Sequence, residues 1–550
     1  MLRNWKVNLI FVAFSLFGLL IVGRLVQLQI IQGAYYEALA LGQQAVFDQT
    51  FIKRGGIFLN NKTCLAQSQE VFFAYLSGEK IAPANLEKEA EFLENIFAKT
   101  KDELIELSRN GKLLKNSITF QQAQQIREKG LAGLWMEKVS ARNYPQANFA
   151  SQVIGFVNNE GNGQYGVEKF YDDDLADFSN DIFLSLDYNI QYFAEKLLNK
   201  ANETWQIASG QIIVQDPTSG KIMAMAHFPN FDCNNYGKEN DLGIFINSAA
   251  QKLFEPGSVF KPLVMAAAIE EGIVAPETKY IDSGVANVGG KDILNFEKRI
   301  WGEQTMIDVL EESINTGMVF VEQKMGSDIF WRYIKNFGLL EKTDIDLPGE
   351  VSSANNSLKN GIPRDFAAAS FGQGIQITPL QMMRAFSALA NNGKMTRPYI
   401  VEKIVKSNGD IEIKEPQGQK QVISEQTAAK ITAMLVSVTR NGSGRLAAVP
   451  GYYIAGKTGT AQVPIQSGGY SDNQTIQSFI GYFPAFKPQY LILVKLDNPR
   501  GIGSAGHSAT PIFRELAKYI IDLKQIPPSP DLVDNTPWNF FWICYIENVF

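Results

Sequence analysis

Apolar residues follow three different patterns along the chain. A continuous apolar run covers residues 7–23, close to the N-terminus. Over residues 28–180, apolar positions recur at helical spacing, in one helix expected to follow Asn85 as its N-cap and in another where Thr119 and Gln122 form a capping box. The rest of the chain alternates short apolar runs with turn sequences and longer helical stretches. These patterns predict a hydrophobic N-terminal segment, a mixed region and a larger α+β region.

The larger region has the clearest signals for individual elements. Asp187 is expected to cap a helix over residues 190–202, and Asp216-Pro217-Thr218-Ser219-Gly220 has the composition of a hairpin turn. Thr378 and Gln381 form a capping box, with a proline at the first helical position. Strands are predicted over residues 182–184, 211–215, 221–226, 454–463, 477–483 and 490–496. Strands at both ends with helices between them predict one α+β domain with an antiparallel sheet.

The N-terminal apolar run is long enough to be a membrane anchor. Basic residues precede residues 7–23 and an arginine, which can extend to the membrane interface, follows them, so the segment reaches the ~20 residues that span a bilayer. We expect residues 7–27 to be a retained anchor, with residues 1–6 in the cytoplasm and the remainder exported. A cleaved signal peptide is the alternative. The nearest small-x-small site, Ala38-Leu39-Ala40, lies well past the run, which favours the anchor.

Composition and charge narrow the range of functions. The formal net charge of −6 argues against nucleic acid as the main partner. The three cysteines are far apart, so no disulfide framework is expected, and two histidines limit both zinc sites and Ser-His-Asp triads. Asp172-Asp173-Asp174 lacks further ligands at suitable spacing, and we interpret this run as a solvated surface. We expect no metal and no cofactor.

A candidate nucleophile lies in the stretch Glu255-Pro256-Gly257-Ser258-Val259-Phe260-Lys261-Pro262. Ser258 and Lys261 are one turn apart on the same face of a helix, and Pro262, which has no N–H group, is expected in its first turn. The alanine-rich run over residues 263–269 predicts a helix buried on all sides. This is the arrangement of a serine nucleophile with a lysine base. Ser-x-x-Lys alone is common, since Ser77-Gly78-Glu79-Lys80 also matches, so further motifs are needed.

Two later motifs supply partners for Ser258. Lys457-Thr458-Gly459-Thr460 lies in a predicted strand, where a glycine often marks the close approach of a ligand or of another backbone, and its threonine hydroxyls can bind a carboxylate. Ser313-Ile314-Asn315 lies between two helical stretches. Ser353-Ala354-Asn355 and Ser471-Asp472-Asn473 match the same Ser-x-Asn pattern. The latter follows the Lys-Thr-Gly strand in a loop rich in glycine and serine, so we assign the function to Ser313.

Ser-x-x-Lys, Ser-x-Asn and Lys-Thr-Gly, in this order, are the motifs of penicillin-binding proteins and class A β-lactamases. Over about residues 3–520 the chain resembles a class B penicillin-binding protein, a membrane-anchored peptidoglycan D,D-transpeptidase. Further matching motifs are Arg54-Gly55-Gly56-Ile57, Tyr144-Pro145, Val153-Ile154-Gly155-Phe156, Gly166-Val167-Glu168-Lys169, Asp216-Pro217-Thr218-Ser219-Gly220 and Ser370-Phe371-Gly372-Gln373-Gly374. The chain departs from the family where Leu59-Asn60 replace an Asp-Arg pair, where Lys62 replaces a common glycine, and in a short link after Lys169. These departures concern partner contacts rather than the chemistry.

The resemblance implies a domain organisation. A transpeptidase domain of the penicillin-binding and β-lactamase type, α+β with helices on both sides of an antiparallel sheet, is expected over residues 181–525. An elongated mixed pedestal or dimerisation domain is expected over residues 28–180, after one transmembrane helix. Residues 526–550 form a tail rich in proline and then in aromatic residues, which docks on the protein or touches the bilayer interface. The expected location is the cytoplasmic membrane, with a single pass and the catalytic domain outside.

The resemblance also implies the chemistry, which is acyl transfer through a serine acyl-enzyme. The implied catalytic residues are Ser258, Lys261, Ser313, Asn315 and Lys457. Ser258 attacks a stem peptide, and Lys261 is the base, its pKa lowered by burial and by the charge of Lys457. Ser313 relays a proton to the leaving amine, and Asn315 holds the substrate amide.

The implied substrate-binding residues are Thr458, Gly459 and Thr460. The two threonines bind the terminal carboxylate, and backbone N–H groups of Ser258 and Thr460 form the oxyanion hole. The expected partners are peptidoglycan stem peptides, β-lactams, the membrane and a separate glycosyltransferase. A β-lactamase or β-lactam sensor is one alternative, which the pedestal and anchor disfavour; a catalytically inactive scaffold is another, which the intact motifs disfavour. A septal or a lateral role in the wall stays open.

Overall fold

The computed structural model describes residues 54–77, 88–109, 113–131, 133–176, 180–359, 361–414, 418–464 and 469–533, with residue 85 and a few positions from 14 to 24. None of the helices in these ranges is both long and apolar enough to cross a membrane. Most of the expected anchor and all of the aromatic tail lie outside the described residues. The chain divides into two compact units, of which unit 1 contains Gln69–Ala141 and unit 2 contains Arg54–Ser68 and Arg142–Phe550. Residues 28–180, the expected pedestal, are thus shared between the two units.

In unit 1, three helices pack on a small group of strands. The elements are β2 (Cys64–Ser77), α4 (Ala90–Phe97), α5 (Lys101–Arg109), β3 (Leu113–Ile118), α6 (Phe120–Lys129) and β4 (Leu134–Asn143). β2 and β3 pair antiparallel, from Phe72 opposite Ile118 to Ser77 opposite Leu113. Buried Leu76 of β2 packs with helix residues to form the core of this unit.

The helix ends in unit 1 test two predictions. Thr119 and Gln122 form the predicted capping box at the start of α6, and Gly130 ends that helix in a left-handed conformation. The prediction of Asn85 as the N-cap of α4 is wrong. The N-cap is Glu89, and its N–H group donates to the carbonyl of Asn85, which itself lies in a helical turn.

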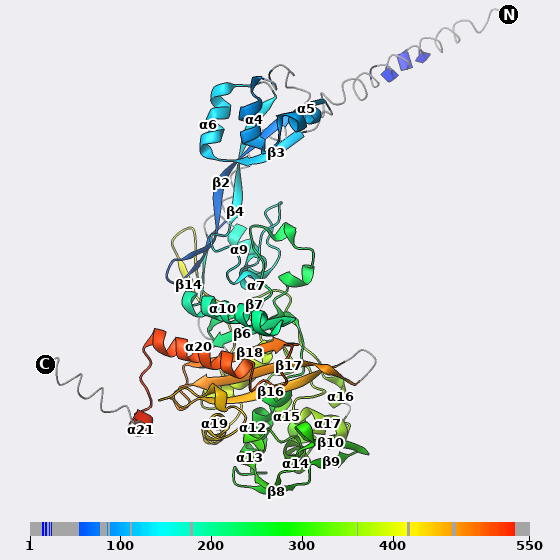
Figure 1. The fold of residues 1–550 in the computed structure, drawn as a ribbon, viewed down its shortest axis with the longest axis vertical. Coiled ribbons are helices and arrows are strands. Elements are labelled where there is room, and N and C mark those ends of the chain that lie inside the picture. Colours follow the sequence, from blue (N-terminus) through cyan, green and yellow to red (C-terminus); the bar gives the residue numbers. More distant parts are fainter. Residues whose placement is uncertain are drawn as a thin grey trace, which may run out of the picture. The chain divides into compact units, whose positions relative to one another are not determined.

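A five-stranded antiparallel sheet forms the centre of unit 2 (Figure 1). Its order is β16 (Ala455–Pro464), β17 (Tyr470–Phe483), β18 (Tyr490–Asp497), β6 (Ser209–Gln215) and β7 (Ile222–Phe228). The predicted hairpin and the three C-terminal strands are confirmed. β17 begins earlier than predicted, so Ser471 lies at the start of this strand and not in a loop. A position in a strand does not by itself exclude Ser471 as the functional serine.

Helices cover both faces of this sheet, as predicted (Figure 1). On one face lie α10 (Tyr188–Trp205) and α20 (Ala509–Lys524); on the other lie α12 (Lys261–Glu270), α18 (Pro379–Ala390) and α19 (Glu425–Arg440). The alternation along β6 makes this division, because Ile212 and Val214 belong to the core with α10 while Ile213 belongs to the core with α12. Asp187 caps α10, and Thr378 caps α18 with the predicted capping box.

The remaining elements of unit 2 complete the surroundings of α12. They include α13 (Met306–Glu311), α14 (Asn315–Met325), α15 (Ser327–Asn336), α17 (Pro363–Ala369), and the strand pairs β8 (Lys279–Asp282) with β11 (Gly302–Thr305) and β9 (Val285–Val288) with β10 (Lys291–Leu294). A separate set of strands joins β1 (Ile57–Leu59) in parallel to β5 (Asp181–Leu184), which pairs with β13 (Val401–Val405). In the turn after β1, Lys62 has a φ of 67°, a left-handed conformation that glycine adopts more easily.

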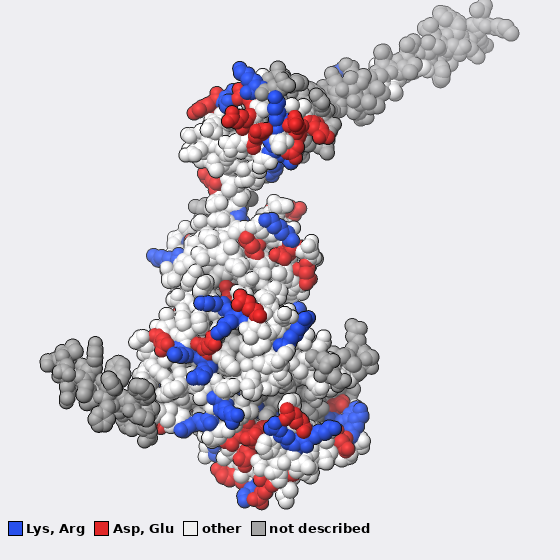
Figure 2. Space-filling model, viewed as in Figure 1, with Lys and Arg blue, Asp and Glu red and all other residues white. Residues whose placement is uncertain are grey.

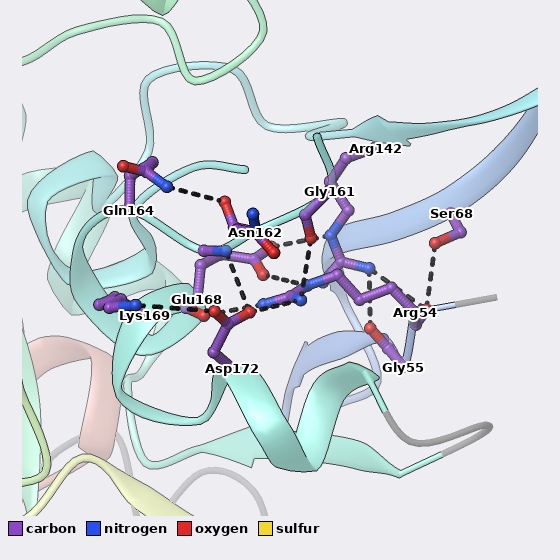
Figure 3. A network of polar contacts seen from close by, with 12 residues as sticks. Arg54, Gly55, Ser68, Arg142, Gly161, Asn162, Gln164, Glu168, Lys169 and Asp172 are labelled. Carbon is purple, nitrogen blue, oxygen red and sulfur yellow. Dashed lines mark hydrogen bonds and ion pairs between the residues drawn. The ribbon is translucent and has the colours of Figure 1, made fainter. Parts of the chain in front are cut away.

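The motif residues from the first part of unit 2 meet at one buried carboxylate, that of Glu168 (Figure 3). Arg54 Nε and Arg142 Nε each donate to one of its two oxygens at 2.7 Å. Arg54 Nη1 also donates to Asp172 at 2.7 Å, and the Tyr144 hydroxyl donates to Glu168 at 3.3 Å. Both guanidinium groups are therefore held by carboxylates in a site with little solvent exposure. Asp172, predicted to be merely solvated, takes part in this network.

Candidate active site

Ser258 lies at the accessible end of a helix that is otherwise enclosed. It belongs to a 3₁₀ turn, Gly257–Phe260, that leads directly into α12. Gly257 has a φ of 60° and donates its N–H group to the carbonyl of Gly372 at 3.0 Å. Residues 261–269 are all buried and Pro262 lies in the first turn of α12, as predicted. Ser258 itself is partly exposed, so a substrate can reach its hydroxyl.

The ammonium group of Lys261 is fully buried and faces the Ser-x-Asn motif. Its Nζ donates to the Ser313 carbonyl at 2.5 Å and to Asn315 Oδ1 at 2.8 Å, and lies 3.3 Å from Ser313 Oγ. No carboxylate bonds to this Nζ within the described ranges. Burial, and secondarily the charge of Lys457, holds the pKa of Lys261 well below its usual value. A lysine in this state can lose its proton near neutral pH.

Ser313 connects the two buried lysines. Its Oγ accepts a hydrogen bond from Lys457 Nζ at 2.9 Å and lies within 3.3 Å of Lys261 Nζ. Burial lowers the pKa of Lys457 to about 7, although Glu312 opposes this effect. Ser313 has a φ of 58°, which is unusual for a residue with a side chain and is typical of functional sites. The arrangement provides a path for a proton between Lys261 and Lys457.

Strand β16 lies directly against the turn that carries Ser258. A Cβ atom on Gly459 would lie 2.8 Å from Val259 and 3.2 Å from the carbonyl of Pro256, which is too close for any side chain. The expectation of a close backbone approach at this glycine is therefore confirmed. β16 is also an edge strand of its sheet, so part of its backbone N–H groups are not used in strand pairing.

The two threonines of β16 have different neighbours. Thr458 Oγ1 lies 3.1 Å from the hydroxyl of Ser443, and it is within 3.3 Å of Lys457 Nζ. Thr460 Oγ1 accepts a hydrogen bond from the N–H group of Ala505 at 3.1 Å. Because this bond uses the oxygen as an acceptor, the hydroxyl proton of Thr460 stays available for an anion.

The structure brings together most of the predicted site residues. Lys261, Ser313, Asn315 and Lys457 form one hydrogen-bonded cluster, and the contact of Gly459 with Val259 brings β16 beside it. Among the described residues, no hydrogen bond joins the Ser258 hydroxyl to Lys261. Catalytic hydrogen bonds often become short only when substrate is bound.

Two residues that no sequence motif identifies hold the Ser-x-Asn loop. Asn295 Oδ1 accepts hydrogen bonds from the N–H groups of Asn315 and Thr316, at 3.0 and 3.1 Å. Asp282 accepts from Asn295 Nδ2 at 2.9 Å and from the Thr316 hydroxyl at 2.6 Å. Both side chains are buried. Asp282 ends β8 and Asn295 directly follows β10, and no local motif in the sequence marks either of them.

Other residues that are close to Ser313 in the sequence, or that match one of the motifs, have different partners. The carboxylate of Glu311 accepts hydrogen bonds from the hydroxyl of Ser437 and from Asn441 Nδ2, on α19 and just after it. Ser471 accepts from the N–H group of Gln474, whereas Ser313 contacts both lysines. These contacts favour Ser313 over Ser471 as the functional serine, in agreement with the prediction. Lys80 of the other Ser-x-x-Lys match lies outside the described residues.

Two protein-family models match the chain. The transpeptidase domain of penicillin-binding proteins matches residues 210–518, and the penicillin-binding protein dimerisation domain matches residues 50–181. The first match contains all three motifs of the candidate site and spans more than half of the chain.

Individual proteins give the same result. The chain is 32% identical over 464 residues to Stage V sporulation protein D of Bacillus subtilis. The alignment covers 78% of this chain and 72% of that protein. It is 28% identical over 513 residues to the probable peptidoglycan D,D-transpeptidase PenA of Neisseria gonorrhoeae, with 87% and 86% covered. The crystal structure of penicillin-binding protein 3 of Mycobacterium tuberculosis with aztreonam has a TM-score of 0.71 at 27% identity, covering 87% of this chain and 98% of that one.

Three observations indicate the same family. They are the family matches, the sheet with its covering helices, and the cluster of serine and lysine side chains. The chain therefore belongs to the class B penicillin-binding proteins, the serine-type D,D-transpeptidases of peptidoglycan.

Proposed function

We propose that Ser258 is the nucleophile that cross-links peptidoglycan stem peptides, with Lys261 as its base. The observation that carries this proposal is the position of Ser313 Oγ between two buried lysines, neither of which has a carboxylate partner among the described residues. A neutral Lys261 takes the proton of Ser258 as its oxygen attacks the carbonyl of the penultimate D-alanine. An ester forms and the amide bond to the terminal D-alanine breaks.

The leaving amine needs a proton, which Ser313 supplies. Its hydroxyl donates to the departing nitrogen and is reprotonated from the lysine pair. In the second step an amine of a neighbouring stem peptide attacks the ester, the new amide bond forms, and the proton of the amine returns through the same groups to Ser258. Asn315, held by its contact with Lys261, is placed to bind the amide of the donor peptide.

Substrate binding is assigned to β16. The hydroxyls of Thr458 and Thr460 bind the terminal carboxylate, which the charge of Lys457 also attracts. The edge position of β16 supports a role for the N–H group of Thr460, with that of Ser258, in binding the oxyanion.

A covalent penicillin adduct tests this function. The β-lactam ring resembles the terminal D-alanyl-D-alanine, so Ser258 opens it and becomes acylated. Release by water requires a further base. Of the two carboxylates that precede Ser313 in the sequence, Glu311 is bound to Ser437 and Asn441 instead, and the charge of Glu312 acts on Lys457, whose pKa it raises. We expect stoichiometric, long-lived labelling by a fluorescent penicillin, and no labelling of Ser258→Ala. Rapid loss of the label with continued turnover indicates a β-lactamase, and no labelling indicates an inactive scaffold.

We also propose that residues 7–27 anchor the protein in the cytoplasmic membrane, with the catalytic domain outside and a separate glycosyltransferase making the glycan strands. The apolar run and its preceding basic residues support the anchor. Protease added to spheroplasts should digest most of the chain; full protection contradicts this topology, and a mature N-terminus near Leu41 shows cleavage. The position of a fluorescently tagged copy in dividing cells distinguishes a septal from a lateral role.

A further inference from the structure

A cavity of about 600 Å³ lies along α10 in unit 2, away from the catalytic cluster. α10 packs on β6 and β7 from the face of the sheet opposite to α12. One side of α10, the segment 146–149 and Asn230 form the walls. The volume lies in the range of small-ligand sites. The five-stranded sheet separates this cavity from Ser258, so the cavity is not a part of the catalytic cleft.

Three aromatic rings with nearly parallel planes form one wall of the cavity. The Phe149 and Tyr188 rings are 5.0 Å apart at 16°, and the Tyr188 and Tyr192 rings are 6.3 Å apart at 5°. The row runs from Phe149, which is buried, to Tyr192, which is 55% exposed. An aromatic face that is open to solvent at the end of an ordered stack is a surface for a flat ligand with C–H groups on its face.

Amide side chains without protein partners line the same cavity. Within the described ranges, no hydrogen bond is made by the side chains of Asn148, Asn199 or Asn230. Glu195 is also part of the wall, and its Oε1 accepts from Ala150 N–H and Gln191 Nε2, both at 2.7 Å. Burial raises the pKa of Glu195 to about 7. The cavity thus offers neutral donors and acceptors, which suit hydroxyl and acetamide groups.

The charges at the cavity do not favour an anionic polymer. The lining contains Lys196, Lys200 and Glu203, so both signs of charge are present. Lys200 is also engaged by Glu515, at 3.1 and 3.2 Å from its two oxygens. Basic and acidic side chains are interspersed on the face of unit 2 that Figure 2 shows. A phosphate-rich or strongly charged ligand would be expected to select a surface with one sign of charge.

We propose that this cavity binds sugar rings of the peptidoglycan glycan strand, a polymer of N-acetylated amino sugars. The ring of Tyr192 packs against the C–H face of a pyranose, and the asparagine amides bond to its hydroxyl and acetamide groups. This inference rests on the transpeptidase function for the identity of the polymer. It adds a second contact with the same substrate, on the sugar backbone and apart from the stem peptide, and so raises the effective concentration of stem peptides near the enzyme.

Isothermal titration calorimetry tests this proposal. It measures how tightly the full-length protein in detergent binds glycan strands from which an amidase has removed the peptides. We expect saturable binding, an affinity about tenfold lower in Tyr192→Ala, and nearly unchanged affinity in Tyr192→Phe, which keeps the ring. Asn199→Ala should also weaken binding. Phe486→Ala, which removes another exposed aromatic ring of unit 2, is the matched control and should bind as the wild type does.

Penicillin acylation separates this proposal from the proposed function. All three cavity variants should be acylated at the wild-type rate, because the sheet lies between the cavity and Ser258. Equal glycan binding by wild type and Tyr192→Ala overturns the cavity site, as does the absence of binding by a wild-type protein that is labelled by penicillin. Binding of sugar-free stem peptide with the same dependence on Tyr192 also overturns it and assigns a peptide site. Failure of wild-type acylation contradicts the transpeptidase assignment instead.

Discussion

Unit 2 contains two buried groups of cationic side chains that have opposite surroundings. In the first, Arg54 and Arg142 share the carboxylate of Glu168, and Asp172 supplies a second negative charge (Figure 3). In the second, Lys261 and Lys457 share the hydroxyl of Ser313, and no carboxylate bonds to either lysine among the described residues. The first group pairs its charges directly, whereas in the second the nearby charge of Glu312 acts on Lys457 without a hydrogen bond to it.

The difference follows from the chemistry of the two cations. A guanidinium group cannot lose its proton in a protein, so a buried one needs acceptors for its charge, either carboxylates, as here, or several carbonyl oxygens, as at Arg384. An ammonium group can lose its proton, and burial shifts its pKa instead. The arginine group therefore stabilises the fold, and the lysine group is suited to proton transfer. Of these two groups, the structural one is therefore marked by hydrogen-bonded carboxylates and the catalytic one by their absence among the described residues.

Replacing the proposed base, Lys261, should have the largest effect on the acylation rate. Lys261→Arg keeps the positive charge but cannot accept a proton, so we expect the acylation rate with a fluorescent penicillin to fall by about a thousandfold. Lys430→Arg, an exposed change on α19, is the control and should leave the rate unchanged. Acylation of Lys261→Arg at a rate near that of the wild type would exclude Lys261 as the base.

Removing the shared carboxylate should destabilise the protein without changing the chemistry. Glu168→Gln leaves two buried guanidinium groups with one remaining carboxylate, so the free energy of unfolding should fall by about 3 kcal/mol. Urea unfolding measures this change, and the acylation rate per folded molecule should stay at the wild-type value. Glu160→Gln, at an exposed site, is the control. Unchanged stability would show that the network contributes little.

The pH dependence of stability should report the lysine group. The pKa of Lys457 is about 7 in the folded protein and close to 10.5 when unfolded, so between these values the unfolded state binds more protons. Stability from this group therefore rises with pH. The unfolding free energy of wild type minus that of Lys457→Met should increase by about 1.4 kcal/mol per pH unit between pH 7 and 9. A difference that does not vary with pH would show that Lys457 keeps its ordinary pKa.

Removing a hydrogen bond that holds the Ser-x-Asn loop should lower the acylation rate moderately. Asn295→Ala removes the acceptor for two backbone N–H groups at the start of α14, so we expect the acylation rate to fall by about tenfold. Asn287→Ala removes the exposed hydrogen bond to Asp292 on the same pair of strands, leaves the hydrogen bonds of Asn295 untouched and serves as the control. Equal rates for both variants would exclude a positioning role for Asn295.

The smallest effect is expected at the competing triplet. Ser471→Ala should change the acylation rate by less than about twofold, because its hydroxyl contacts neither lysine, whereas Ser313→Ala interrupts the path between them and should lower the rate about a hundredfold. The same labelling assay compares the two. A larger loss in Ser471→Ala would show that the assignment of the motif is reversed.

Features that depend on neighbouring residues could be predicted from the sequence. The capping boxes at Thr119 and Thr378 are made within four residues, and so is the turn at Asp216. The enclosed helix after Lys261 was evident from its composition. The catalytic motifs were found because each is short, and their meeting followed from the family resemblance rather than from geometry.

Contacts between distant segments could not be predicted in this way. Asn295 lies 20 residues from Asn315, and nothing local marks it as a support. β17 begins earlier than predicted because glycine and serine are typical of loops, whereas pairing with β16 extends this stretch as a strand to Tyr470, opposite Pro464. Asn85 is not the N-cap of α4, because the chain forms a further helical turn before α4 begins.

The complete enclosure of α12 determines how long the catalytic centre persists. Local fluctuations open peripheral helices and loops, but amide hydrogens in a helix covered on every side exchange only when the surrounding core opens. Lys261, in the first turn of α12, is therefore expected to stay in place through local motions that leave this core closed. Slow hydrogen exchange in α12 would measure the rarest opening of the domain, and the lifetime of the catalytic centre would equal the lifetime of the folded domain itself.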